Sequence, residues 1–115
     1  VPAGGSDGED LAQAAARELA EETGFQALRW REVGRINALN GVCRAPESVW
    51  LARGLSRLPD SAQEIARHGQ AEEGIATVQL VAWATALGWA ADGTITDGET
   101  VAALALAGLY LGRFR

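Results

Sequence analysis

The segment from Glu9 to Phe25 constrains this chain more than any other part of the sequence. Glu9 is followed by seven residues and then by the run Arg-Glu-Leu-Ala-Glu-Glu-Thr-Gly-Phe, which begins at Arg17. Apolar residues recur along one arc of this segment, and that periodicity predicts an amphipathic helix. Gly24 can adopt a positive φ angle, so we expect the helix to end there.

Three carboxylates share one side of this predicted helix. Because an α-helix turns by about 100° per residue, Glu18 and Glu22 project one above the other, with Glu21 beside them. Arg17 precedes Glu21 by four residues, so it can pair with that carboxylate and orient it. Hard oxygen ligands gathered in this way suit Mg²⁺ or Mn²⁺. The alternative is an ordinary solvated surface, because Glu, Arg, Ala and Leu are all strong helix formers.

The same residues resemble the signature of the Nudix hydrolases. That signature reads GxxxxxE, seven residues, then REUxEExGU, where U is a bulky apolar residue, and every specified position from Glu9 to Phe25 is matched. The opening differs, since Ala3 stands where the signature has glycine. Residues 2–9 instead resemble the PAGxxDxGE loop of Nudix enzymes that cleave ADP-ribose and sugar nucleotides.

The resemblance implies roles for individual residues. Glu18 and Glu22 are the expected ligands of Mg²⁺ or Mn²⁺, and Glu21 is a third ligand or the group that orients the attacking water. Glu21 and Glu22 are therefore also candidate catalytic residues. The backbone carbonyl of Ala3 is expected to add another oxygen. Orienting or structural roles are expected at Arg17, Glu9 and Gly24.

Charged residues outside this segment are further candidates. Enzymes that cleave ADP-ribose bring a glutamate from a loop before a late strand, and Glu72 and Glu73 occupy that place here. Either is an extra ligand or the catalytic base, although adjacent glutamates in a polar loop are equally well explained as solvated charges. Glu64 is a more distant candidate. Arg35 and Arg44 are candidate phosphate contacts, or simply surface charges.

Length and charge restrict the class of protein. The 115 residues, 48% of them apolar, suit a single domain over residues 1–115 with its own core. A net charge of −5 argues against nucleic acid or an anionic membrane as a partner. Cys43 is the only cysteine, so we expect a small buried residue and no internal disulfide. The longest apolar run, Val101 to Gly112, is shorter than the roughly 20 residues of a membrane-spanning helix, and the expected location is cytoplasmic.

Three strands are expected after the acidic helix. Residues 27–36 and 48–55 contain alternating apolar side chains and are separated by a loop with Asn40-Gly41. Residues 75–82 are apolar on nearly all sides, which predicts a buried central strand.

Helices are expected near the C-terminus. Residues 61–74 are polar and predict a mobile loop or a short helical piece, and residues 83–91 predict a short helix. A capping box from Thr96 to Glu99 predicts the start of the last helix. This order resembles the later two-thirds of a Nudix-type α/β/α sandwich with a mixed sheet, so the expected fold class is α/β. The resemblance implies two or three strands upstream, so the N-terminal part of the sheet is expected to be missing from this sequence.

The resemblance also implies an activity. Nudix enzymes let water attack a phosphorus of a nucleoside diphosphate linked to another group. The expected substrate is ADP-ribose or a related nucleotide sugar, giving a nucleoside monophosphate and a sugar phosphate, and the expected assembly is a homodimer. Two alternatives remain open: a Nudix-like module that binds a nucleotide sugar without cleaving it, and an acidic helical interaction domain with a coincidental motif.

Overall fold

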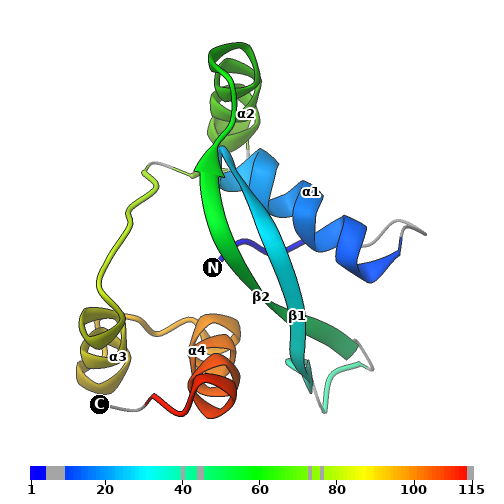
Figure 1. Ribbon diagram of the computed structural model, residues 1–115. Coiled ribbons are helices and arrows are strands. Elements are labelled where there is room, and N and C mark those ends of the chain that lie inside the picture. Colours follow the sequence, from blue (N-terminus) through cyan, green and yellow to red (C-terminus); the bar gives the residue numbers. More distant parts are fainter. Residues whose placement is uncertain (5–9, 40, 44–45, 73, 76, 114–115) are drawn as a thin grey trace. The chain divides into compact units, whose positions relative to one another are not determined.

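Four helices and two strands form in the part of the chain that the computed structural model describes, which is residues 1–4, 10–39, 41–43, 46–72, 74–75 and 77–113. In chain order they are α1 (Leu11–Thr23), β1 (Phe25–Asn37), β2 (Pro46–Arg57), α2 (Asp60–Glu72), α3 (Trp83–Asp92) and α4 (Gly98–Leu111) (Figure 1). The predicted α/β class is confirmed.

The chain divides into two compact units. The α1–α2 unit contains residues 2–31 and 52–79, and therefore α1, α2 and the adjoining halves of both strands. The α3–α4 unit contains Val1 with residues 32–51 and 80–115, and therefore the hairpin end of the strands, α3 and α4. All the candidate carboxylates of α1 belong to the α1–α2 unit.

Helix α1 has a defined start and a defined end. Asp10 is its N-cap, and the carboxylate of Asp10 accepts a hydrogen bond from the backbone N–H of Gln13 at 3.4 Å. At the other end Gly24 has a φ of 75°, and its N–H donates to the carbonyl of Ala20. Only glycine adopts this left-handed conformation routinely. The predicted end of the helix at Gly24 is confirmed.

Four elements meet at Gly24. Its carbonyl accepts hydrogen bonds from the N–H of Leu58 at 2.9 Å and from Nε2 of Gln63 at 2.5 Å. Leu58 follows β2, and Gln63 lies in the first turn of α2. These bonds therefore connect the end of α1 and the start of β1 to the end of β2 and the start of α2.

Strands β1 and β2 form a two-stranded antiparallel sheet. The hydrogen bond between Gly24 and Leu58 lies just outside the two strands and sets their register. In the same register Gly54 lies opposite Leu28, where a Cβ atom at Gly54 would be 3.1 Å from the Cβ of Leu28. Both strands extend slightly beyond the predicted ranges of 27–36 and 48–55.

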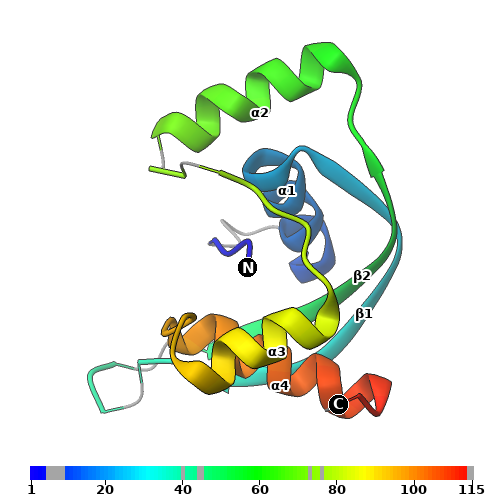
Figure 2. The ribbon, with the colours of Figure 1, turned by 90° about the vertical axis from the view of Figure 1, so that its left-hand side faces the viewer.

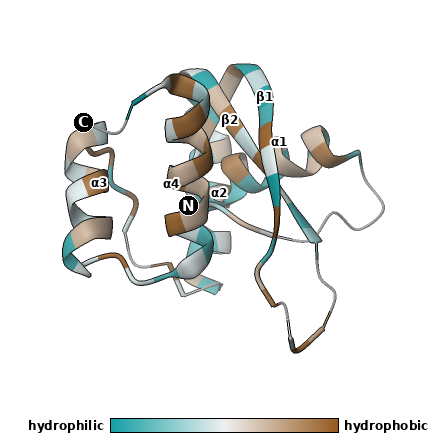
Figure 3. Ribbon diagram, turned by 90° about the horizontal axis from the view of Figure 1, so that it is seen from below, coloured by the Kyte–Doolittle hydropathy of each residue, from teal (hydrophilic) through white to brown (hydrophobic). Residues whose placement is uncertain are grey.

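The buried apolar positions are small in both units. Helices α1 and α2 lie side by side (Figure 2) and contact each other, and their buried residues include Ala14 and Ala66. Short side chains let helix axes approach closely. In the α3–α4 unit apolar residues recur along α4 (Figure 3), and Leu106 packs against Gly34 of β1, where any Cβ would lie 2.8 Å from its Cδ2.

Two predictions were wrong. Residues 75–82 do not form a central strand, because the described part of this segment is not paired in a sheet, and Leu80 is 73% exposed. A central strand needs a hydrogen-bonded neighbour on each edge, and the described sheet contains only β1 and β2. Cys43 is exposed rather than buried, because it lies in the loop between the two strands.

The helices also refine the sequence predictions. The segment predicted as a loop or short helical piece contains α2, a regular helix of 13 residues. The N-cap of α4 is Asp97 and not Thr96, since the carboxylate of Asp97 accepts from the N–H of Thr100 at 3.0 Å. No helix formed by the described residues is long and apolar enough to cross a membrane.

The Gly24 junction makes a stability prediction. Gly24→Ala should lower the free energy of unfolding by about 1–2 kcal/mol or more, the usual cost of a left-handed L residue. The added Cβ would also overlap the side-chain amide of Gln63. Urea denaturation followed by circular dichroism measures the change.

Gly88→Ala is the matched control, because no heavy atom lies within 4 Å of a Cβ at this position in α3. It should raise the stability by about 0.5–1 kcal/mol through helix propensity. A Gly24→Ala variant as stable as the wild type would contradict the described junction.

Candidate active site

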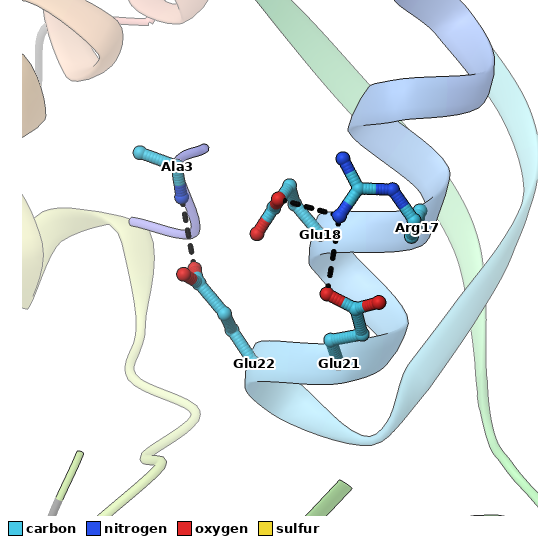
Figure 4. Close-up of polar contacts among 5 residues, drawn as sticks. All are labelled: Ala3, Arg17, Glu18, Glu21 and Glu22. Atoms are coloured by element: carbon cyan, nitrogen blue, oxygen red, sulfur yellow. Dashed lines mark hydrogen bonds and ion pairs between the residues drawn. The ribbon is translucent and has the colours of Figure 1, made fainter. Parts of the chain in front are cut away.

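The structure places the backbone of Ala3 and Gly4 against the acidic face of α1. The N–H of Ala3 donates to Oε2 of Glu22 at 2.9 Å (Figure 4). Gly4 lies against Glu18, since a Cβ atom at Gly4 would overlap the carboxyl group of Glu18. The carboxyl group of Glu18 would therefore have to shift to make room for a side chain at residue 4. Two carboxylates and a short stretch of main chain converge at this point.

Arg17 lies between two of the three carboxylates. Its Nη1 atom is 2.8 Å from Oε1 of Glu18 and 3.2 Å from Oε2 of Glu21. The predicted pair of Arg17 and Glu21 is confirmed, and Glu18 is an additional partner. One guanidinium group therefore offsets the repulsion between two neighbouring carboxylates on the same helix.

The carboxylates differ in their surroundings. The side chain of Glu18 is 15% exposed, whereas that of Glu21 is 57% exposed. Because partial burial strengthens electrostatic interactions, Glu18 is the better placed of the two to bind a cation. Glu22 faces Ala3, while Glu21 contacts Arg17 (Figure 4). Glu18 and Glu22 thus form a pair beside the Ala3–Gly4 backbone, and Glu21 stands apart from it.

The donor set suits one kind of metal ion. Within the described residues, no three Asp, Glu, His or Cys side chains are arranged to hold a metal ion. Mg²⁺ does not need such a cage, because it commonly binds one or two carboxylates and keeps several waters or substrate oxygens as its other ligands. Glu18, Glu22 and the neighbouring backbone of Ala3 fit that requirement.

The hydroxyl group of Thr23 makes two hydrogen bonds in the last turn of α1. The hydroxyl of Thr23 donates to the carbonyl of Leu19 at 2.6 Å and accepts from the N–H of Phe25 at 3.2 Å. These two bonds direct the chain from the helix into β1 directly after Glu22. The sequence pattern assigned no role to Thr23, although threonine is a residue type that often makes such local bonds.

Other predicted site residues are distributed more widely. Glu64 and Glu72 are exposed on α2, and Glu72 is its last residue. Arg35 belongs to the α3–α4 unit, where its Nε is 3.2 Å from Oε1 of Glu32. Three predicted site residues lie outside the described part of the chain: Glu9, Arg44 and Glu73.

A second group of carboxylates lies in the α3–α4 unit. Glu47, at the start of β2, is hydrogen-bonded to Glu99, in the first turn of α4. Burial, followed by the negative charge of Glu99 and this hydrogen bond, raises the pKa of Glu47 above its ordinary value. Glu47 therefore keeps its proton to a higher pH than an ordinary glutamate does.

Comparison with known protein families decides the identity. A family model described as a NUDIX domain matches residues 1–104. The chain belongs to the Nudix family. No curated protein and no solved structure gives a significant match. As a Nudix hydrolase, it acts on phosphorus-containing anhydrides in nucleoside diphosphate derivatives, and the acidic face of α1 lies within the matched region.

Arg17 provides a test of this site. Arg17→Met keeps an apolar stem but removes the cation shared by Glu18 and Glu21, and both carboxylates are then free to move. We expect hydrolysis of a nucleoside diphosphate derivative to fall by about 10- to 100-fold, as is typical when a group that orients a ligand is lost.

Arg67→Met, on an exposed position of α2, is the matched control and should keep the wild-type rate. Steady-state kinetics of both variants make the comparison. Equal rates for Arg17→Met and the control would show that Arg17 does not orient these carboxylates.

Proposed function

We propose that this Nudix hydrolase cleaves ADP-ribose or a related nucleotide sugar with Mg²⁺ or Mn²⁺, giving a nucleoside monophosphate and a sugar phosphate. One observation carries the proposal: the backbone of Ala3 and Gly4 lies against Glu22 and Glu18, with the N–H of Ala3 2.9 Å from Oε2 of Glu22. The same segment opens the loop that resembles those of ADP-ribose and sugar-nucleotide enzymes.

Glu18, Glu22 and the carbonyl of Ala3 are the proposed ligands of the cation. When bound there, a divalent cation supplies positive charge for the phosphoryl oxygens and makes water a stronger nucleophile. This charge matters because a protein with a net charge of −5 otherwise repels a diphosphate. Gly4 contributes by keeping the main chain close to Glu18.

The remaining acidic residues are proposed to handle the attacking water. The side chain of Glu21 is far more exposed than that of Glu18, so we assign Glu21 to orienting or deprotonating water rather than to the cation. Glu72 and Glu73 are the proposed alternatives for the base or for an extra ligand. Arg35 and Arg44 are proposed phosphate contacts.

We also propose that the enzyme is a homodimer. This proposal rests on the resemblance to sugar-nucleotide Nudix enzymes, which are often homodimers.

Incubation with ADP-ribose and Mg²⁺, assayed for AMP, tests the proposed reaction. The wild type should release AMP, and Glu22→Gln should lower kcat/KM by about 10²- to 10³-fold, the usual effect of losing one preorganised electrostatic group. Glu99→Gln is the matched control, because it makes the same chemical change on α4 in the other unit.

The possible outcomes separate the hypotheses. Binding of ADP-ribose without release of AMP would favour the non-catalytic nucleotide-sugar module. Hydrolysis of other nucleoside diphosphate derivatives, but of neither ADP-ribose nor any nucleotide sugar, would overturn the proposed substrate. Equal losses of kcat/KM in Glu22→Gln and Glu99→Gln would contradict the proposed role of Glu22.

A further inference from the structure

A glutamine of α2 fixes the end of the helix that carries the active-site carboxylates. Gln63 is 7% exposed, and its Nε2 donates to the carbonyl of Gly24 at 2.5 Å and to the carbonyl of Leu58 at 3.3 Å. We propose that Gln63 is a positioning residue for hydrolysis, which acts by fixing the last turn of α1. This inference rests on the proposed role of Glu22.

The contact between Gln63 and Gly24 is unusually close. A Cβ atom at Gly24 would overlap Oε1 of Gln63, so the amide packs directly against the main chain of the glycine. The glycine carbonyl also accepts from the N–H of Leu58. Gly24 is buried as well. Water therefore has little access to replace a lost hydrogen bond between the Gln63 amide and the carbonyl groups of Gly24 and Leu58.

The position of Gly24 is transmitted to the carboxylates through the last turn. The N–H of Gly24 donates to the carbonyl of Ala20 at 2.9 Å, which ties the two ends of that turn together. Glu21 and Glu22 lie between these two residues. A shift of Gly24 would therefore move Glu22 away from the N–H of Ala3.

The neutral amide of Gln63 matches the two carbonyl groups that it faces. Its NH₂ group has two donors for the two carbonyl oxygens of Gly24 and Leu58. Leucine is similar in size but has no donor, and an ionised glutamate would direct negative oxygens at both carbonyls. A protonated glutamate can donate one hydrogen bond, and burial favours that protonated form by raising its pKa.

Kinetics of Gln63 variants test the proposal. Gln63→Leu should lower kcat by about tenfold or more, since small displacements of catalytic groups have effects of this size. Gln70→Leu makes the same change on the same helix and should keep the wild-type kcat. Activity is compared at a temperature at which circular dichroism shows each variant to be folded.

A pH series separates positioning from a general loss of stability. Gln63→Glu should resemble Gln63→Leu at high pH, and its kcat relative to the wild type should recover as the pH falls and the new carboxyl group gains a proton. Ala86→Gly, at a buried position of α3 in the other unit, destabilises the protein without touching α1 and should show neither the loss nor the recovery.

A wild-type kcat in Gln63→Leu would overturn the proposal, and so would an equal loss of kcat in Ala86→Gly. Amide chemical shifts provide a readout that does not need substrate. Gln63→Leu should shift the resonances of Glu21, Glu22 and Ala3, and unchanged resonances would contradict the proposal. If these shifts appear but the wild type does not hydrolyse nucleotide sugars, the proposed substrate fails and the positioning of α1 by Gln63 stands.

Discussion

The carbonyl of Gly24 is the point on which the α1–α2 unit depends. A left-handed glycine ends α1, and its carbonyl then accepts from both Leu58 and Gln63. A residue with a side chain would be strained there and would also collide with Gln63. Because the glycine follows Glu22 by only two residues, the constraint that builds the fold also determines where the carboxylates lie.

The positions of the three carboxylates on α1 determine how their charges interact. Three carboxylates on one helical face repel one another, and Arg17 offsets part of this by contacting Glu18 and Glu21. Glu22 instead accepts a hydrogen bond from the main chain at Ala3. The protein thus separates the carboxylates into a pair beside the N-terminal segment and a third, exposed group. A Mg²⁺ ion that keeps several waters needs no larger set of protein ligands.

Much of this unit could be predicted from the sequence because its signals are local. The helix, its end at Gly24 and the pair of Arg17 with Glu21 all depend on spacings of four residues or fewer. Contacts between distant segments carry no such signal. Gln63 binds a carbonyl 39 residues away, and nothing in a polar stretch marks it out. Gly4 likewise meets Glu18 only once the chain has folded.

At residues 75–82 the sequence instead predicted a strand that the structure does not form. Its composition fits a strand flanked on both sides, but composition cannot supply the hydrogen-bonded neighbours that such a strand needs. The predicted burial of Cys43 was wrong for a related reason. A small apolar residue is buried only when the segment around it is buried, and Cys43 lies in an exposed loop.

Paramagnetic broadening by Mn²⁺ locates a bound cation without any assumption about substrate, so it can test whether Glu18 and Glu22 form a cation site. Substoichiometric Mn²⁺ should first broaden the amide resonances of Ala3, Gly4, Glu18 and Glu22. Broadening that begins instead around Glu47 and Glu99, or that spreads evenly over the acidic surface, would contradict a cation site on α1.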